Sequence, residues 1–248
     1  MDKASKERFQ EACDKIVYQQ REREGIGTLS EKTMHAVVKN YVEPDEQYHE
    51  IPTNGFVADV RHGQEVLEIQ TRSFNVMRRK LESFLPLYQV TIVHPIPATK
   101  WLSWIDEDTG EVTSRRKSPK RGTPYMAFKE LYKIKPFLMN ENLRIRLLMI
   151  DVEESRLLNG WSQDRKKGSV RHDRIPVELI EDILIECPRD YMMLIPEELP
   201  DEFLTKDFAK ASKLPLGQAQ TALNILHFLG LVERVGKRGN AFIYQTIY

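Results

Sequence analysis

Hydrophobic positions recur at helical spacing in two N-terminal segments, residues 3–23 and residues 28–42. Apolar residues three and four positions apart line one face of an α-helix, so each segment predicts an amphipathic packing helix. The apolar stripe of the first helix consists of Phe9, Ala12, Cys13, Ile16 and Val17, and that of the second helix of Met34, Val37, Val38 and Tyr41.

The pattern then changes from helical spacing to strand spacing. Residues 56–71 predict a β-hairpin that turns at Gly63 and Gln64, because Gly at the first position of a two-residue loop is typical of such turns. Residues 72–85 predict a helix, and the apolar run 88–96 predicts a buried strand. The order helix, hairpin, helix, strand is typical of an α/β core around a mixed sheet.

The middle of the chain adds a hairpin, a helical segment and a strand to this core before a polar interruption. Residues 100–122 predict a second hairpin, residues 125–138 a helical segment and residues 143–154 a core strand. The polar and basic stretch 159–176 then interrupts the hydrophobic pattern. We therefore divide the chain into an α/β domain with its N-terminal packing helix (1–160), a basic linker (161–175) and a small C-terminal domain (176–248).

The C-terminal domain is predicted to be an α+β unit. Its pattern indicates a first helix at 177–186, a short strand and a second helix at 202–214, a third helix at 215–230 and a hairpin at 231–247. The tip of this hairpin is expected at Gly236, Lys237, Arg238 and Gly239.

Composition narrows the function classes. The 248 residues contain 37 basic and 37 acidic side chains, so the net charge does not indicate a partner. The two cysteines are far apart and show no disulfide or zinc spacing, which is typical of a reducing compartment. No apolar run is long enough to cross a bilayer, and the polar N-terminus does not resemble a signal peptide. These features favour a cytoplasmic protein without a membrane partner.

Two acids face each other across the first hairpin. With a two-residue loop, Asp59 lies directly opposite Glu68, on the face that also carries Val57, Val66 and Gln70. Opposed side chains have Cβ atoms about 4.5–5.5 Å apart, so two carboxylates at this position repel each other. Solvent, a shared proton or a bound cation must offset that repulsion. A four-residue loop keeps both acids on one face, whereas a three-residue loop does not.

Asp59, followed by the run Glu68-Ile69-Gln70 on the next strand, resembles the motif of the PD-(D/E)XK nuclease superfamily. The core of that family runs helix, hairpin, strand, helix, strand. The resemblance implies a restriction-endonuclease-like fold in which Asp59 and Glu68 bind Mg²⁺ (or Mn²⁺) and Gln70 occupies the position of the catalytic lysine. Mg²⁺ prefers oxygen ligands and takes one or two carboxylates together with water and phosphate, which agrees with such a pair.

The chain departs from the family pattern at two positions. Ala58 stands where the proline of the motif would be, and Gln70 cannot carry the charge of the lysine that it replaces. Lys80, on the helix that follows, is a candidate for a displaced lysine. The resemblance also implies an acid on the preceding helix, for which Glu31 is the candidate, although Thr28-Leu29-Ser30-Glu31 equally fits a capping box. His35 lies one turn beyond Glu31 and is expected at the surface or beside the metal ligands.

The segment 223–244, LNILHFLGLVERVGKRGNAFIY, carries a second resemblance, to the winged helix-turn-helix family. That resemblance implies DNA binding, with the third helix in the major groove and the hairpin on the phosphate backbone. Amide side chains can pair with adenine edges, and basic side chains neutralise phosphates. The residues implied are Gln218, Gln220, Thr221 and Asn224 on the outward face of the third helix and Lys237 and Arg238 in the hairpin. Winged helices also serve as protein–protein modules, and this third helix carries no Lys or Arg.

Two further basic segments agree with a nucleic-acid partner. One spans residues 165–174, and the other consists of Arg115, Arg116, Lys117, Lys120 and Arg121. Clustered basic residues release counterions from phosphates, although such runs also occur as solvated loops. Trp101 and Trp104 precede the second segment; three residues apart, they lie on opposite faces of a strand, so one of them is expected in the core.

The hypothesis that joins these features is a metal-dependent endonuclease for double-stranded DNA, with a winged helix that docks the substrate. A homodimer is compatible with it. The first alternative is a DNA-binding transcriptional regulator whose nuclease-like half has lost activity, which the missing lysine favours. The second is a protein–protein interaction module, favoured if the basic segments are buried or paired with acids. An open cleft around Asp59, Glu68 and Gln70 favours the enzyme, whereas a closed or lysine-paired acid pair favours the regulator.

Overall fold

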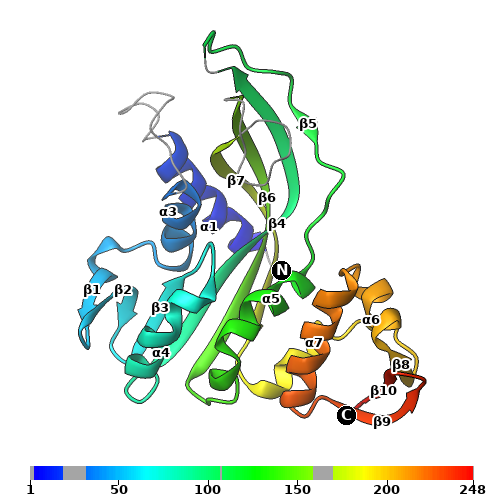
Figure 1. Cartoon of the computed structure of the whole chain (residues 1–248). Helices are drawn as coiled ribbons and strands as arrows, with labels where there is room; N and C mark the ends of the chain where they lie inside the picture. The colour runs from blue at the N-terminus through cyan, green and yellow to red at the C-terminus, as the bar shows by residue number, and fades with distance from the viewer. Residues whose placement is uncertain (1–2, 19–31, 107, 159–169, 248) are drawn as a thin grey trace.

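A seven-stranded mixed sheet forms the centre of the molecule, with the strand order β1-β2-β3-β4-β6-β7 and with β5 beside β4 (Figure 1). The computed structural model describes residues 3–18, 32–106, 108–158 and 170–247. The strands are β1 (His49–Thr53), β2 (Phe56–His62), β3 (Glu65–Ile69), β4 (Gln89–Asp106), β5 (Arg116–Lys117), β6 (Leu143–Leu158) and β7 (Val170–Ile185). The sheet and its helices agree with the predicted α/β class.

Helices cover both faces of this sheet. On one face lie α1 (Lys3–Cys13), the π-helical turn η1 (Asp14–Tyr18) and α3 (Lys32–Val42), whose buried side chains join those of β4, β6 and β7. The other face carries the turn η3 (Phe74–Met77) with α4 (Arg78–Phe84), and the turns η4 (Pro124–Ala127) and η5 (Tyr132–Phe137) around α5 (Phe128–Leu131). Residues 19–31, which include part of both predicted N-terminal helices, lie outside the described residues.

The predicted turn of the first hairpin is confirmed. His62 pairs with Glu65, so Gly63 and Gln64 form a two-residue loop, and Gly63 has a φ of 53°, in the left-handed region that glycine adopts readily. Both faces of this hairpin are buried, because Val60 and Val66 are fully buried on opposite faces. β1, which the sequence pattern does not predict, pairs with β2 on its other edge.

Strand β4 is twice as long as the predicted strand and replaces the first half of the predicted second hairpin. It runs parallel to β3 at residues 89–93 and continues beside β6 to Asp106. The expected return strand is short, since β5 pairs with β4 only at Trp101 and Leu102. The C-terminal parts of β4 and β6 and the N-terminal part of β7 extend beyond the helices (Figure 1). This extension is called the arm, and β5 lies on its edge.

The helix predicted at 177–186 is wrong, because these residues belong almost entirely to β7. β7 pairs antiparallel with β6, and three register shifts in the ladder move its apolar positions away from strict alternation. The resulting spacing imitates a helix, with Leu179 and Ile185 buried and Ile180 exposed. Pro176 is tolerated within the strand because β7 lies at the edge of the sheet.

The remaining C-terminal elements follow the predicted order. They are the turn η6 (Pro188–Leu194), β8 (Glu202–Leu204), α6 (Thr205–Ser212), α7 (Leu216–Phe228), β9 (Val232–Arg238) and β10 (Ala241–Thr246). The three strands form a second sheet in the order β8-β10-β9. The likeness of this unit to a winged helix stays a prediction.

This C-terminal unit shares one hydrophobic core with the large sheet. Phe128 of α5 lies with its ring centroid 6.5 Å from that of Phe208 in α6, and both are buried in the same cluster as Leu223 of α7. The helices α5 and α7 therefore lie side by side (Figure 1). Among the described helices, none has the length and apolar character that crossing a membrane requires.

Candidate active site

Asp59 lies where strands β2 and β3 diverge, just beyond the paired residues Val60 and Leu67. Its Oδ2 accepts a hydrogen bond from the backbone N–H of Ile69 at 2.7 Å and lies 3.3 Å from Nε2 of His35 on α3. Only 15% of the Asp59 side chain is exposed. Both of these contacts are made by Oδ2, and together they orient the Asp59 carboxylate.

Glu68 lies on β3 and is fully buried beside a lysine. Nζ of Lys80, on α4, donates to both carboxylate oxygens of Glu68 at 2.8 Å and to the backbone carbonyl of Val57 at 2.7 Å. The Glu68 side chain is 1% exposed and that of Lys80 is 23% exposed. The predicted candidate for a displaced lysine therefore lies in contact with the second acid of the motif.

The two acids titrate differently because their surroundings differ. Burial would raise the pKa of Asp59, but His35, the N–H of Ile69 and the charge of Lys80 outweigh it, and that pKa is lowered. Burial and then the charge of Asp59 raise the pKa of Glu68 to about 7, although Lys80 opposes the rise. Near neutral pH the pair therefore carries one fixed negative charge on Asp59 and one titratable proton on Glu68.

Both acids line one open pocket together with Gln70 and with basic side chains. His35, Arg72 and Lys80 also line the pocket, together with Thr71 and Ser73. The backbone of Gln70 is held in the sheet, since its N–H donates to Val93 at 2.9 Å and its carbonyl lies 2.5 Å from Nδ1 of His94. The structure thus brings together Asp59, Glu68 and Gln70.

The two features that were expected to separate an enzyme from a regulator occur together. The pocket is open and lined by basic residues, which favours an enzyme, and Glu68 is paired with Lys80, which favours a regulator. Arg72 was missed by the sequence analysis; its signal is that it follows Gln70 by two residues, just beyond the end of β3 at Ile69.

The side chains that line the pocket include oxygen donors of the kind that Mg²⁺ prefers. The pocket offers two carboxylates and an amide, the oxygen ligands that Mg²⁺ accepts. A carboxylate has about four lone-pair sites, so the two bonds from Lys80 to Glu68 leave sites for a cation. Among the described residues, no group of three His, Cys, Asp or Glu side chains forms a candidate metal cluster. Glu31, the predicted third acid, lies outside those residues.

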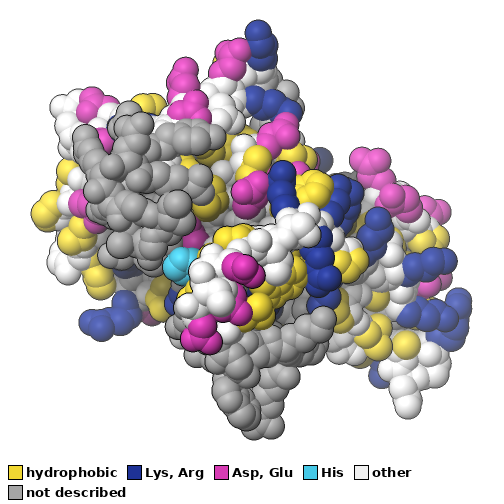
Figure 2. All heavy atoms as spheres, turned by 90° about the horizontal axis from the view of Figure 1, so that it is seen from above, with side chains coloured by type: hydrophobic (Ala, Val, Ile, Leu, Met, Phe, Trp, Pro, Cys, Tyr) yellow, Lys and Arg dark blue, Asp and Glu magenta, His cyan; other side chains and the backbone are white. Residues whose placement is uncertain are grey.

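The predicted basic segment lies along the arm, with its side chains over two tryptophans. The guanidinium of Arg115 lies 4.2 Å from the ring centroid of Trp101, and that of Arg116 lies 4.5 Å from the ring centroid of Trp104. Both rings are half-buried, so the expectation that one tryptophan belongs to the core is wrong. Arg115 also pairs with Glu153 at 3.0 Å. Lys117, Lys120 and Arg121 are exposed, and Lys and Arg side chains gather beside hydrophobic ones in the view from above (Figure 2).

The predicted DNA-reading face of α7 is partly covered. Asn224 is half-buried and accepts a hydrogen bond from Nζ of Lys135, on η5, at 2.8 Å, so its predicted outward orientation is wrong. Thr221 donates to the carbonyl of Gly217 at 3.0 Å, whereas Gln218 is half-buried and Gln220 is exposed. Contact with η5 and α5 weakens the case for α7 as a helix that enters a DNA groove.

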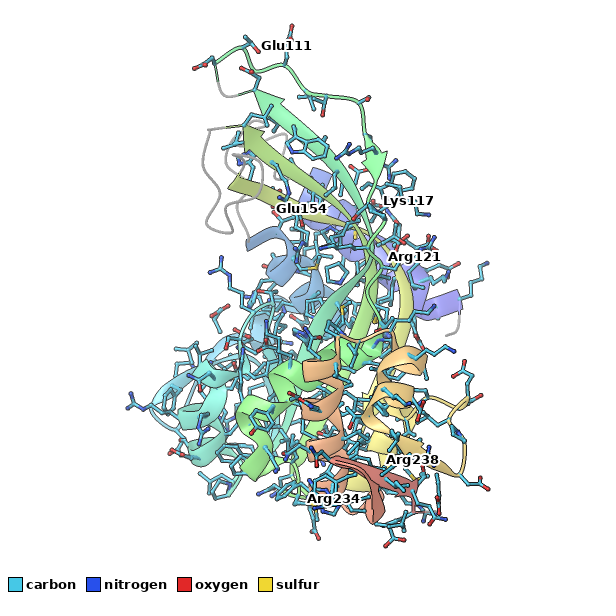
Figure 3. All side chains as sticks on the ribbon, turned by 45° about the vertical axis from the view of Figure 1, so that its right-hand side comes forward. Glu111, Lys117, Arg121, Glu154, Arg234 and Arg238 are labelled. Atoms are coloured by element: carbon cyan, nitrogen blue, oxygen red, sulfur yellow. The ribbon has the colours of Figure 1, made fainter. Side chains whose placement is uncertain are left out.

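The basic residues of the C-terminal hairpin are exposed. Lys237 and Arg238 lie at the end of β9, next to the turn at Gly239 (Figure 3). The Lys237 side chain is exposed, and its Nζ lies 4.9 Å from the ring centroid of Phe242. Arg234, on the same strand, stacks on that ring at 4.2 Å. The hairpin therefore presents positive charge, as expected.

Comparison with known proteins gives a family but no activity. A family model described as "Domain of unknown function (DUF8091)" matches residues 32–186, more than half of the chain. A relative from Treponema pallidum (strain Nichols), named "Uncharacterized protein", is 26% identical over 223 residues, which cover 89% of this chain and 87% of the relative. No solved structure gives a significant match. The matched family segment contains the whole acid pocket and the arm, and excludes the C-terminal hairpin.

Proposed function

The chain belongs to the DUF8091 family, and because that description names no activity, we propose from the acid pocket that the protein is a metal-dependent DNA endonuclease. The observation that carries the proposal is the convergence of Asp59, Glu68, Gln70 and Lys80 in one open pocket. The order α3, three antiparallel strands, α4 and a parallel strand β4 supports it, because the PD-(D/E)XK resemblance implies that order.

Each residue of the pocket has a role in the proposed hydrolysis. Asp59 and Glu68 hold a magnesium ion, which when bound polarises the scissile phosphate and lowers the pKa of a water ligand. Lys80 supplies the positive charge that Gln70 lacks, close enough to Glu68 to stabilise charge on a phosphate oxygen. The amide of Gln70 orients the phosphate or the attacking water by hydrogen bonds. Ile69 and His35 hold Asp59 in place.

The proposed substrate is double-stranded DNA, bound through the basic segment of residues 115–121 and through Lys237 and Arg238. Exposed basic side chains on the arm and on the hairpin support this assignment. A role for Gln218 and Gln220 in contacting bases belongs to the same proposal. The homodimer and the cytoplasmic location stay predictions.

A non-catalytic DNA-binding regulator is the second candidate. The ion pair between Lys80 and Glu68 favours it, because the ammonium already neutralises the buried acid without a metal ion. This candidate predicts DNA binding that depends on salt and not on a divalent cation. The two candidates therefore differ in one measurable property, which is metal-dependent cleavage.

Cleavage of supercoiled plasmid and of duplex oligonucleotides tests the proposal. We expect nicking with Mg²⁺ or Mn²⁺ and none with a chelator. Asp59→Asn and Glu68→Gln should each lower the rate by about 100-fold or more, since loss even of a group that only supports a metal ligand costs about 10–100-fold. Glu65→Gln is the matched control, because Glu65 lies on the same strand and is exposed.

The isosteric amide substitutions keep the shape of the buried site, so loss of activity can be separated from loss of folding by circular dichroism. If all three variants cleave at the wild-type rate, the acid pair is not a metal site. Absence of cleavage by the wild type, together with salt-sensitive DNA binding, would establish the regulator instead.

A further inference from the structure

A groove leads away from the acid pocket toward the arm. The pocket around Asp59 and Glu68 shares Thr71, Arg72 and Ser73 with a second cleft. That cleft continues over residues 94–97 of β4 and is bordered by Arg174 of β7. Because three consecutive residues line both clefts, the two clefts lie next to each other, and together they are called the groove below, with the acids at one end.

The groove lies where one edge of β4 changes partners. β3 pairs with β4 as far as Val93, and β5 begins to pair at Trp101. Pro95 and Pro97 lie between these points and have no N–H to donate to a neighbouring strand. The basic segment 115–121 ends here, because Gly122 donates to the carbonyl of Ala98 at 2.9 Å. The segment therefore reaches the groove at Pro97.

Arg174 is held at the side of this groove by a buried acid. Its Nη2 and Nε donate to Oε2 of Glu154 at 2.9 and 3.3 Å, and Glu154 is 1% exposed. Arg156 binds the other oxygen, Oε1, at 2.8 and 2.9 Å. One carboxylate thus binds two guanidinium groups. Glu154 fixes the orientation of both.

We propose that this groove carries the phosphodiester backbone of DNA away from the acid pocket, that Arg174 is a phosphate-binding residue in it, and that Glu154 positions Arg174. The backbone then reaches Lys120 and Arg121, at the C-terminal end of the basic segment. A guanidinium group has five N–H donors, so Arg174 can bind Glu154 and a phosphate oxygen at the same time. The proposal extends the proposed nuclease function. It depends on that function only for the direction in which the DNA strand runs along the groove.

Glu130, the acid that lines the second cleft, is compatible with a polyanionic ligand. Glu130 lines the groove, but its carboxylate accepts bonds from Lys133 at 2.7 and 2.9 Å and from the N–H of Phe74 at 3.0 Å. Its charge is therefore neutralised by a neighbour. Arg72 is a basic residue that lines both clefts.

Arg174→Gln and Arg156→Gln form a matched pair for the test. Each removes one guanidinium from Glu154, and their side chains are 22% and 30% exposed, so the two variants lose the same kind of ion pair with Glu154. Arg174 lines the groove, whereas Arg156 is not among the described residues that line it. The probe is a fluorescent duplex oligonucleotide, bound in the presence of a chelator so that cleavage does not contribute.

We expect Arg174→Gln to weaken binding about five- to tenfold and to lower the slope of log K against log salt by about one, because one phosphate contact is lost. Arg156→Gln should change affinity less than about twofold. Equal effects of the two variants, or no effect of Arg174→Gln, would overturn the groove. A selective effect without any cleavage by the wild type would uphold the groove and reject the nuclease.

Discussion

At the scale of single residues, the acid pocket is defined by how Glu68 is surrounded. Lys80 contacts both of its oxygens, yet burial and the nearby charge of Asp59 raise its pKa to about 7. Folding therefore keeps a proton on Glu68 up to about pH 7, whereas an exposed glutamate loses its proton near pH 4.5. A metal ion and a proton compete for the same oxygens.

The raised pKa of Glu68 predicts a pH dependence of stability. Between about pH 4.5 and pH 7 the folded protein binds more protons at this position than the unfolded chain, so the free energy of unfolding falls as pH rises. From pH 5 to pH 7.5 the loss from this group is roughly 2–3 kcal/mol. Glu68→Gln should lack this loss, whereas Glu65→Gln should retain it. Urea unfolding at the two pH values measures the difference; identical pH profiles for all three proteins would refute the raised pKa.

At the scale of elements, the basic segment depends on a close backbone approach. A Cβ atom at Gly122 would lie 2.1 Å from the carbonyl oxygen of Pro97, in β4. Only glycine allows this distance, so Gly122 determines where residues 115–121 join the groove. The cation–π contacts with Trp101 and Trp104 then hold the segment along the arm.

Gly122→Ala should therefore displace the segment and lower the free energy of unfolding by about 1–3 kcal/mol, as overpacking does elsewhere. It should also weaken DNA binding, because the exposed basic residues move with the segment. Gly217→Ala is the control: a Cβ there meets nothing within 4 Å, and alanine favours helix α7, so stability should stay constant or rise by up to about 1 kcal/mol. Chemical denaturation and the anisotropy assay measure both effects. Unchanged behaviour of Gly122→Ala would mean that the segment does not approach Pro97.

At the scale of the whole molecule, the C-terminal unit is joined to the large sheet by a shared core. Phe128, Leu131 and Phe208 are buried in the cluster that also contains Leu223 and Tyr244. Residues 176–185, which the sequence pattern places with the C-terminal unit, form the C-terminal part of β7 in the large sheet. We therefore expect the described elements on both sides of this contact to unfold together.

Phe208→Ala tests this cooperativity. Removing a fully buried aromatic ring should lower the free energy of unfolding by about 3–5 kcal/mol and shift one common transition. Phe228→Ala is the matched control, because that ring is 41% exposed and contacts Lys135 only through a cation–π interaction worth about 1 kcal/mol. Calorimetry and near-UV circular dichroism follow the transition. A separate, lower transition for the C-terminal unit would show that it is an independent domain.

The sequence by itself determined the local elements and the identity of the acid pair. The hairpin turn at Gly63 and Gln64 depends on two adjacent residues, and the alternation of side chains then places Asp59 near Glu68. The order of the C-terminal elements from β8 to β10 follows from local hydrophobic period and glycine positions in the same way. Such features need no knowledge of distant residues.

Only the tertiary structure decided the strand conformation of residues 177–186, the length of β4 and which side chains contact the predicted site residues. A segment with apolar spacing near the helical period becomes a strand because β6 offers a pairing edge with three register shifts. Lys80 contacts Glu68 from a different element, and Asn224 turns toward Lys135 rather than toward solvent. These contacts join residues 12 to 89 positions apart, and their free energy depends on packing between elements, which local spacing does not encode.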